Sequence, residues 1–291
     1  MATANQQIHY RTATVRGVEI FYREAGSPDL PTILLLHGFP TSSHMFRDLI
    51  PLLADRYHLV APDYPGFGYS ARPTPDDFTY TFDHLAEVME GFADTLGLTR
   101  YSLYMQDFGG PVGFRLATRR PRQVRALIIQ NANAYEAGVS SGVKDVVLRI
   151  WKERTPATEA RLRELFELPV TRRQYLEGVP DPTRVSPDAW EHAQWGMDRP
   201  GNKDIQFVLH ANYGSNVERY PEWHDYFRKY QPPALIVWGR NDFVFLPAGA
   251  EAYGRDLKHV ELHMFDAGHF ALETHVAEIA DCIRGFRAAR E

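Results

Sequence analysis

Short apolar runs alternate with helical patterns along most of this chain, and this alternation limits the possible folds more than any other feature. The buried runs are Ile33 to Leu36, His58 to Ala61, Tyr101 to Met105 and Ala126 to Ile129, while Ala234 to Trp238 and Val260 to Phe265 supply two more strands near the C-terminus. Runs of this length and composition predict strands that are buried on both faces, as in a parallel sheet. The helical patterns between them, such as Phe82 to Leu96, predict right-handed crossover connections.

Three further segments extend this pattern towards the ends of the chain. Arg11 to Val15 and Val18 to Arg23 alternate in polarity around Gly17, which predicts two strands joined by a turn. Near the other end, Phe270 to Arg287 has a helical pattern. We therefore predict an α/β fold with about eight strands in a mainly parallel sheet and helices on both faces.

The region from residue 135 to residue 230 interrupts the alternation. It contains helical stretches and the proline-rich segment VPDPTRVSP but no buried strand run. We predict that it forms a helical lid inserted into one core, with residues 1–134 as the first part of the core and residues 231–291 as the second. A chain of 291 residues is long enough for one such unit.

Charge and composition argue against several functional classes. The net charge is −5 and the basic residues are scattered, which disfavours binding to nucleic acids or membranes and favours a small organic substrate. The single cysteine, Cys282, can form neither an intrachain disulfide nor a cysteine metal cluster. Because the N-terminus is not signal-like and no run of about 18 apolar residues occurs, we expect a cytoplasmic protein. The oligomeric state is left open, with a homodimer as one alternative.

Asp107 is the first candidate for chemistry. The strand predicted over Tyr101 to Met105 runs into the sequence QDFGG, and a helical pattern follows from Pro111 to Thr118, so Asp107 lies on a strand-to-helix turn. This is the nucleophile position of a nucleophile elbow, although an aspartate there can also serve only as a helix cap. Met105 stands where the serine-hydrolase motif has its first glycine, and aspartate replaces the serine. A serine esterase is therefore excluded at this position.

Polar or glycine residues also follow three other predicted strands. The sequence HGFP follows the first buried strand, where the backbone N–H groups of Phe39 and Phe108 would form an oxyanion hole and Pro40 would take a cis peptide. Asp242 follows a later strand, and His269 follows the last one. Each has an alternative as an ordinary turn residue. Together with Asp107, however, they give the chain order nucleophile, acid, base that is expected of a fold with a nucleophile elbow.

Several segments resemble one known group of enzymes. HGFPTSS, APDYPGFGYS, QDFGGPVG, WGRND and GHF are similar to the blocks of the α/β-hydrolase superfamily, specifically its epoxide hydrolase and haloalkane dehalogenase branch. They span both halves of the predicted core, whereas the predicted lid matches poorly. The resemblance implies a catalytic triad with Asp107 as nucleophile, His269 as base and Asp242 as the partner of the base.

The implied mechanism has two stages. The carboxylate displaces a leaving group from an sp³ carbon, and water activated by His269 then cleaves the resulting alkyl ester of Asp107. The backbone amides near Phe39 and Phe108 would hold the oxyanion of the second stage. This chemistry requires no metal and no organic cofactor.

The leaving group distinguishes the two chemistries of this branch. Epoxide hydrolases similar to this chain take O–H donors from lid tyrosines, and Tyr213 in the sequence NYGSN resembles such a tyrosine, with Tyr175 as the second candidate. Dehalogenases commonly place a tryptophan, as an N–H donor, directly after the nucleophile. Here that residue is Phe108, whose side chain has no N–H donor. Alternative halide donors are the tryptophans of the predicted lid region, Trp151, Trp190, Trp195 and Trp223.

Epoxide hydrolysis to a diol is therefore the leading hypothesis. Cleavage of a carbon–halogen bond in a haloalkane or haloacid is the second, and cleavage of another activated ester or carbon bond is the third. A ligand-binding protein that keeps the pocket of the hydrolase fold without turnover is the alternative from a different class.

Overall fold

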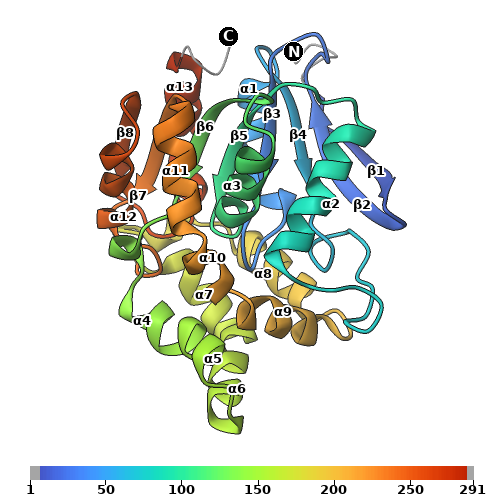
Figure 1. Cartoon of the computed structure of the whole chain (residues 1–291), viewed down its shortest axis with the longest axis vertical. Helices are drawn as coiled ribbons and strands as arrows, with labels where there is room; N and C mark the ends of the chain where they lie inside the picture. The colour runs from blue at the N-terminus through green and yellow to red at the C-terminus, as the bar shows by residue number, and fades with distance from the viewer. Residues whose placement is uncertain (1–6, 287–291) are drawn as a thin grey trace.

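The computed structural model describes residues 7–286 and contains one eight-stranded sheet (Figure 1). The strand order is β1-β2-β4-β3-β5-β6-β7-β8. The strands are β1 (His9–Val15), β2 (Val18–Ala25), β3 (Thr32–Leu36), β4 (His58–Pro62), β5 (Tyr101–Gln106), β6 (Val124–Gln130), β7 (Ala234–Gly239) and β8 (Val260–Phe265). The predicted α/β fold with a mainly parallel sheet is confirmed.

Parallel pairing brings the carboxyl ends of most strands to one edge of the sheet. β3 is parallel to β4 and β5, and β6, β7 and β8 continue in the same direction. β1 and β2 form an antiparallel hairpin, and β2 is antiparallel to β4. Every residue of β3, β4, β5 and β7 is buried. Burial on both faces explains why these strands appear in the sequence as unbroken apolar runs.

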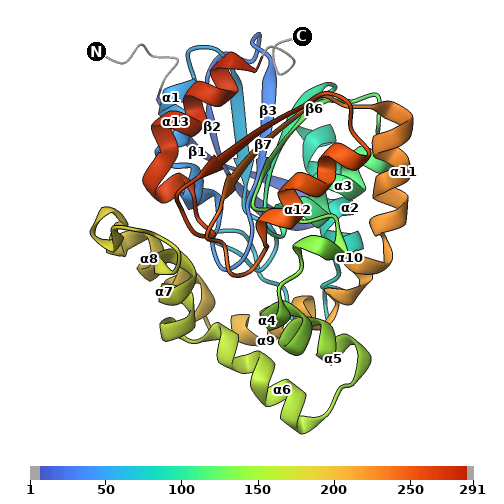
Figure 2. The same ribbon diagram turned by 90° about the vertical axis from the view of Figure 1, so that its left-hand side faces the viewer.

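Helices cover both faces of the sheet (Figure 2). On one face lie α2 (Phe82–Thr95), α3 (Gly109–Arg119), α11 (Tyr220–Tyr230) and α12 (Pro247–Ala252), and on the other lie α1 (Leu49–Leu53) and α13 (Leu272–Gly285). Two apolar clusters fill the spaces between the sheet and these layers, one around Phe92 and the other around Ile279. The predicted last helix extended to Arg287, which lies outside the described residues.

Helix α2 illustrates how the sequence specifies these layers. Thr81 is the N-cap, and its side chain accepts a hydrogen bond from the N–H of His84. Leu85, Val88 and Phe92 follow at helical spacing and are fully buried. The helix therefore presents one apolar stripe to the sheet.

Between β6 and β7 the described chain forms helices and no strand, and one isolated β-bridge joins Val139 in this segment to Phe245, which follows β7. The α-helices before α11 are α4 (Ser141–Val143), α5 (Arg149–Lys152), α6 (Pro156–Arg163), α7 (Leu168–Leu176), α8 (Pro187–Met197), α9 (Asn202–Ala211) and α10 (Gly214–Glu218). They gather beyond the carboxyl edge of the sheet (Figures 1 and 2). They are therefore placed to cover whatever lies at the strand ends.

Helix α11 differs from the other helices of the region predicted as a lid. It runs beside α3, as Figure 1 shows. Trp223 and Phe227 are fully buried, with ring centroids 5.1 and 5.5 Å from that of Phe114 in α3. This helix is thus part of the layer that covers the sheet.

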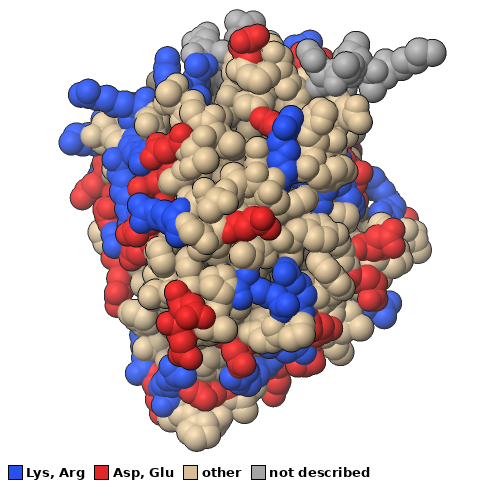
Figure 3. Space-filling model, turned by 90° about the vertical axis from the view of Figure 1, so that its right-hand side faces the viewer, with Lys and Arg blue, Asp and Glu red and all other residues tan. Residues whose placement is uncertain are grey.

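The surface carries both signs of charge. Basic and acidic side chains are interspersed over the face seen in Figure 3. Within residues 7–286, no helix combines the length and the apolarity that a membrane span requires.

Candidate active site

Asp107 lies at the end of β5, in the sharp turn that leads into α3. Its backbone φ is +49°, which is uncommon for a residue that carries a Cβ atom. The neighbouring Gly109 packs directly on β3, because a Cβ atom there would lie 2.1 Å from the carbonyl oxygen of Leu36. Glycine therefore allows α3 to begin against the sheet. This tight turn is the local geometry that the sequence predicted for a nucleophile elbow.

The side chain of Asp107 is buried and held by backbone amides. Its Oδ1 accepts a hydrogen bond of 2.7 Å from the N–H of Phe39. Burial raises the pKa of Asp107, and the charge of His269 and the amides of Phe39 and Phe108 offset only part of this effect. The two amides predicted for an oxyanion hole thus both act on this carboxyl group. The Phe39–Pro40 peptide is cis, as the sequence indicated.

His269 lies between two carboxylates. Its Nδ1 is 2.8 Å from Oδ2 of Asp242, and its Nε2 is 3.7 Å from Oδ2 of Asp107. Burial disfavours the imidazolium, but the charge and hydrogen bond of Asp242 and the charge of Asp107 outweigh it and raise the pKa of His269. Asp242 also accepts the N–H of Val244 at 2.7 Å. The structure therefore brings the three predicted triad residues together, with Nε2 of the imidazole directed towards Asp107.

Two residues that the sequence analysis missed complete this network. Asn131 follows β6 and donates a hydrogen bond of 2.8 Å to Oδ2 of Asp242, while its carbonyl oxygen accepts the N–H of Asp107 at 3.3 Å. The amide nitrogen of Gln106 is 3.1 Å from Nε2 of His269, where it can donate to a neutral imidazole. Asn131 follows a buried strand, as Asp107 and Asp242 do. That position was the signal that would have identified it.

A cavity of about 340 Å³ opens at Asp107. Its walls are mainly apolar and include Phe39, Phe108, Val143, Val147, Leu165, Val170 and Phe245. Ser140, Gln174, His210 and Tyr213 add polar groups, and Arg161, Glu164 and Arg173 also line it. A cavity of this size and polarity suits a small, largely apolar molecule.

Tyr213 is the predicted leaving-group donor that the structure places in this cavity. Its ring centroid is 5.9 Å from that of Phe108. Burial, together with the charges of neighbouring groups that include Asp107, raises the pKa of Tyr213 well above its ordinary value. The phenol is therefore protonated at neutral pH and is able to donate a hydrogen bond.

Tyr175 is not brought to the cavity. It is fully buried, and its ring stacks on that of Phe270 with centroids 4.0 Å apart. The preceding residue, Gln174, lines the cavity instead. Successive residues of a helix point about 100° apart, so α7 directs Gln174 into the cavity and Tyr175 towards the core. The prediction of Tyr175 as a second donor is corrected by this orientation.

His210 is a further residue of the cavity wall that the sequence analysis did not single out. Its Nδ1 is 2.8 Å from the carbonyl oxygen of Gln206, to which it donates. Burial lowers the pKa of His210 to about 4, so the ring is neutral at physiological pH and Nε2 is an acceptor. Its spacing of three residues from Tyr213 on a helical pattern was the available signal.

Some groups considered from the sequence do not reach the cavity. Its lining, among the residues that the structure describes, includes none of Trp151, Trp190, Trp195 and Trp223. Across residues 7–286, no group of three or more His, Cys, Asp or Glu side chains is arranged to hold a metal ion.

Comparisons with known proteins identify the family and the fold. A family model described as the alpha/beta hydrolase fold matches residues 31–276. An uncharacterized hydrolase of Saccharomyces cerevisiae is 43% identical over 268 residues, which cover 91% of this chain and 92% of the relative. A haloalkane dehalogenase of Bradyrhizobium diazoefficiens is 42% identical over 121 residues, or 42% of this chain and 38% of the relative. The crystal structure of haloalkane dehalogenase DbeA from Bradyrhizobium elkani has a TM-score of 0.81 and 26% identity, and covers 97% of this chain and 100% of that chain.

Proposed function

We propose that this chain, a member of the alpha/beta hydrolase fold family, belongs to the epoxide hydrolase and haloalkane dehalogenase branch of that family, as its partial relatives and structural neighbours suggest. In this proposal it hydrolyses small epoxides to diols through an ester on Asp107. The observation that carries the choice of epoxide is the phenol of Tyr213 in the same cavity as Asp107. An epoxide oxygen becomes a basic alkoxide as the ring opens, so an O–H donor stabilises the transition state. The side chain of Phe108, the residue after the nucleophile, offers no N–H to a halide.

In the first step, a carboxylate oxygen of Asp107 attacks an epoxide carbon. Oδ1 is held by the amide of Phe39, which leaves Oδ2 as the attacking atom. The ring C–O bond breaks as the ester bond forms, and the alkoxide takes the proton of the Tyr213 hydroxyl. The product of this step is a hydroxyalkyl ester of Asp107 and a phenolate.

In the second step, water attacks the ester carbonyl of Asp107. His269 takes one proton of the water at Nε2, and the amides of Phe39 and Phe108 stabilise the oxyanion. When the ester C–O bond breaks, the departing alkoxide takes the proton from the imidazolium and leaves as the diol. The new carboxylic acid then ionises, and its proton restores the hydroxyl of Tyr213 through solvent.

Carbon–halogen hydrolysis is the second candidate. It is supported by the identity to haloalkane dehalogenases in part of the chain and by Gln174 in the cavity wall, because an amide N–H is a weak donor of the type that a halide accepts. Both candidates share an ester on Asp107, so the chemical nature of the adduct distinguishes them.

The test is a His269→Gln variant, which should form the ester but hydrolyse it slowly. The variant is incubated with a mixture of epoxides and bromoalkanes, and the intact mass and the modified peptide are measured. We expect a hydroxyalkyl adduct on Asp107. A plain alkyl adduct would instead establish the second candidate.

Two controls define the limits of this test. Wild-type protein should show no lasting adduct, and Asp107→Asn in the His269→Gln background should form none. Modification of a residue other than Asp107 would overturn the proposed mechanism. Absence of any adduct across the substrate panel would favour a ligand-binding protein without turnover.

A further inference from the structure

The sequence NYGSN is anchored to the core on both sides of Tyr213. Before the tyrosine, Oδ1 of Asn212 accepts the N–H of Phe82, the first residue of α2, at 3.1 Å. After it, Oδ1 of Asn216 accepts a hydrogen bond of 2.7 Å from Nη1 of Arg115. The N–H of Asn216 also donates to the carbonyl oxygen of Tyr213 at 2.9 Å. The polar residues of this motif therefore hold the backbone turn that carries the phenol.

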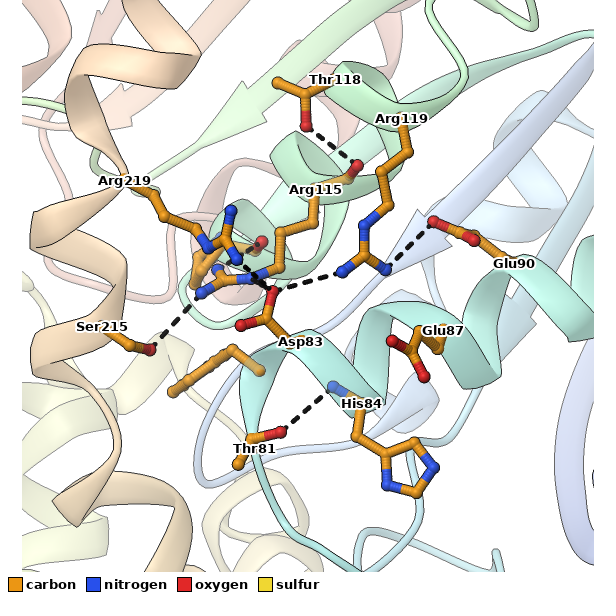
Figure 4. Close-up of polar contacts among 12 residues, drawn as sticks. Thr81, Asp83, His84, Glu87, Glu90, Arg115, Thr118, Arg119, Ser215 and Arg219 are labelled. Carbon is orange, nitrogen blue, oxygen red and sulfur yellow. Dashed lines mark hydrogen bonds and ion pairs between the residues drawn. The ribbon is translucent and has the colours of Figure 1, made fainter.

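Arg115 is the central group of this anchor. It lies in α3, the helix that begins beside the candidate nucleophile, and only 1% of its surface is exposed. Nε donates to Oδ1 of Asp83 at 2.9 Å, and Nη2 donates to Ser215 at 3.4 Å (Figure 4). Nη1 also donates to the carbonyl oxygen of Pro111 at 3.1 Å. Because a guanidinium holds its donors in one rigid plane, a single side chain joins α2, α3 and α10.

Asp83 holds the far end of the same segment. Arg115, Arg119 and Arg219 all reach its Oδ1, at 2.9, 3.2 and 3.0 Å (Figure 4). Burial opposes ionisation, but the charges and hydrogen bonds of Arg115 and Arg219 lower the pKa of Asp83. Arg219 directly follows α10, so the carboxylate secures this helix at its end. Arg119 connects α3 to α2, because its side chain binds Asp83 and Glu90, which both lie in α2.

An aromatic contact links this cluster to the cavity. The ring of Phe82 lies nearly perpendicular to the rings of Phe108 and Tyr213, with centroids 4.8 and 5.8 Å apart. The guanidinium of Arg115 is 5.8 Å from the centroid of the same Phe82 ring. A displacement of Arg115 would therefore change both the backbone of the tyrosine turn and the ring that packs on the phenol.

We propose that Arg115 is a positioning residue for the hydroxyl of Tyr213. Through Asn216 and Ser215, it holds this hydroxyl where it can protonate the epoxide oxygen of a substrate that Asp107 attacks. This inference rests on the proposed function of Tyr213. It assigns to an arginine outside the cavity a role in one step only, because Tyr213 acts when the ester forms and not when water attacks it. Errors in placement of about 1 Å can cost about 100-fold in rate.

The test compares ester formation in four proteins that all carry His269→Gln: the parent, Arg115→Gln, Tyr213→Phe and the combination of the last two. The rate of adduct formation with an epoxide is followed by intact mass. We expect Arg115→Gln to slow it at least tenfold. In the Tyr213→Phe background, the same substitution should have no further effect, because the arginine acts through the phenol. An equal slowing in both backgrounds would overturn the proposal.

Arg119→Gln is the matched control, since it removes a neighbouring arginine from the same helix and the same aspartate. Its rate of ester formation should stay within about twofold of the parent, as expected for an exposed ion pair. In protein that keeps His269, a single-turnover experiment should give the same rate of ester breakdown with and without Arg115→Gln. Slowing of ester breakdown by Arg115→Gln would indicate a general structural role and contradict the proposal.

A second measurement requires neither turnover nor a folded Arg115→Gln variant. 3-Fluorotyrosine is placed at position 213, and its ¹⁹F resonance is compared in the parent, in Asn216→Ala and in Arg119→Gln. We expect one sharp line in the parent and in Arg119→Gln, and a shifted or broadened line in Asn216→Ala. An unchanged line in Asn216→Ala would overturn the inference. If the parent formed no adduct on Asp107, the proposed function would fail separately, as its own test shows.

Discussion

Asp107 would serve in two chemical states, and the groups around it suit both. As a carboxylate it accepts the amide N–H of Phe39 at Oδ1, which leaves the other oxygen free for attack. As an ester in the proposed mechanism, the same Oδ1 becomes the oxyanion of the tetrahedral intermediate. Fixed amides need no rearrangement between these states, which is the condition for effective electrostatic stabilisation.

The pH dependence of the two steps should differ. Both Asp107 and His269 act in their deprotonated forms, so each step is lost as pH falls through the pKa of the group that it needs. The pKa of His269 is raised above 6.5 and that of Asp107 above 3.8. Ester hydrolysis should therefore be lost as pH falls through the raised pKa of His269, and ester formation as pH falls through the raised pKa of Asp107. Because the ordinary pKa of histidine lies well above that of aspartic acid, we expect hydrolysis to be lost first.

Rapid-quench mass spectrometry of the wild-type protein between pH 5 and pH 9 checks this order, since the ester should accumulate as the pH is lowered. The same acid limit for both steps would contradict the assignment of His269 to hydrolysis alone.

Removal of the Tyr213 hydroxyl should affect epoxides selectively. We expect Tyr213→Phe to slow ester formation from an epoxide by about 100-fold or more, the usual loss for a general acid, and to slow attack on a bromoalkane far less. Tyr175→Phe is the matched control, because that ring stacks on Phe270 outside the cavity and its rate should be unchanged. Single-turnover adduct formation measures both. Equal losses in the two variants would remove Tyr213 from the mechanism.

At the scale of elements, the candidate site depends on where parallel strands end. Asp107, Asp242 and His269 follow β5, β7 and β8, and Asn131 follows β6. Parallel pairing places all four strand ends on one edge, so residues far apart in the chain meet without long loops. The helices between β6 and β7 then close the cavity over this edge.

The contact between α5 and α10 sets the position of the tyrosine turn. A Cβ atom at Gly214 would lie 2.1 Å from the ring of Trp151, so Gly214→Ala must displace the ring or the helix that carries it. We expect a loss of about 1–3 kcal/mol in the free energy of unfolding, as in other overpacked sites, together with slower ester formation. Denaturant unfolding and single-turnover kinetics measure the two effects.

The double variant Gly214→Ala/Trp151→Ala should recover part of both losses, since it removes the ring. Gly196→Ala is the control, because it lies inside α8 with open space around a Cβ atom. It should stabilise the protein by about 0.5–1 kcal/mol. Destabilisation by Gly196→Ala as large as that by Gly214→Ala would refute the contact as the cause.

At the scale of the whole molecule, the region predicted as a lid includes residues that support the core. Trp223 in α11 is fully buried against α3, whereas Trp195 in α8 is 46% exposed. Trp223→Ala should lower the free energy of unfolding by about 3–5 kcal/mol, the range for a buried aromatic residue. Trp195→Ala should cost much less. Urea unfolding distinguishes them, and equal costs would show that α11 is not part of the core layer.

Local patterns were sufficient for much of this protein. The buried strands appear as apolar runs because burial on both faces removes polar residues from them. Asp107 and Asp242 could be selected because each follows such a run, and His269 because it follows the last predicted strand; parallel strands must end at one edge. The pattern of the elbow also excluded a serine nucleophile at residue 107. These conclusions depend on short stretches of chain and on the geometry of a parallel sheet.

The cavity depended on contacts that no local pattern contains. Gln174 and Tyr175 are neighbours in one helix, and only the orientation of α7 against the core decides which of them faces Asp107. The hydrogen bond between Arg115 and Asn216 joins residues 101 positions apart. The sequence by itself therefore determined the sheet and the candidate triad, whereas the tertiary structure decided which side chains surround a substrate, because helix packing sets their direction.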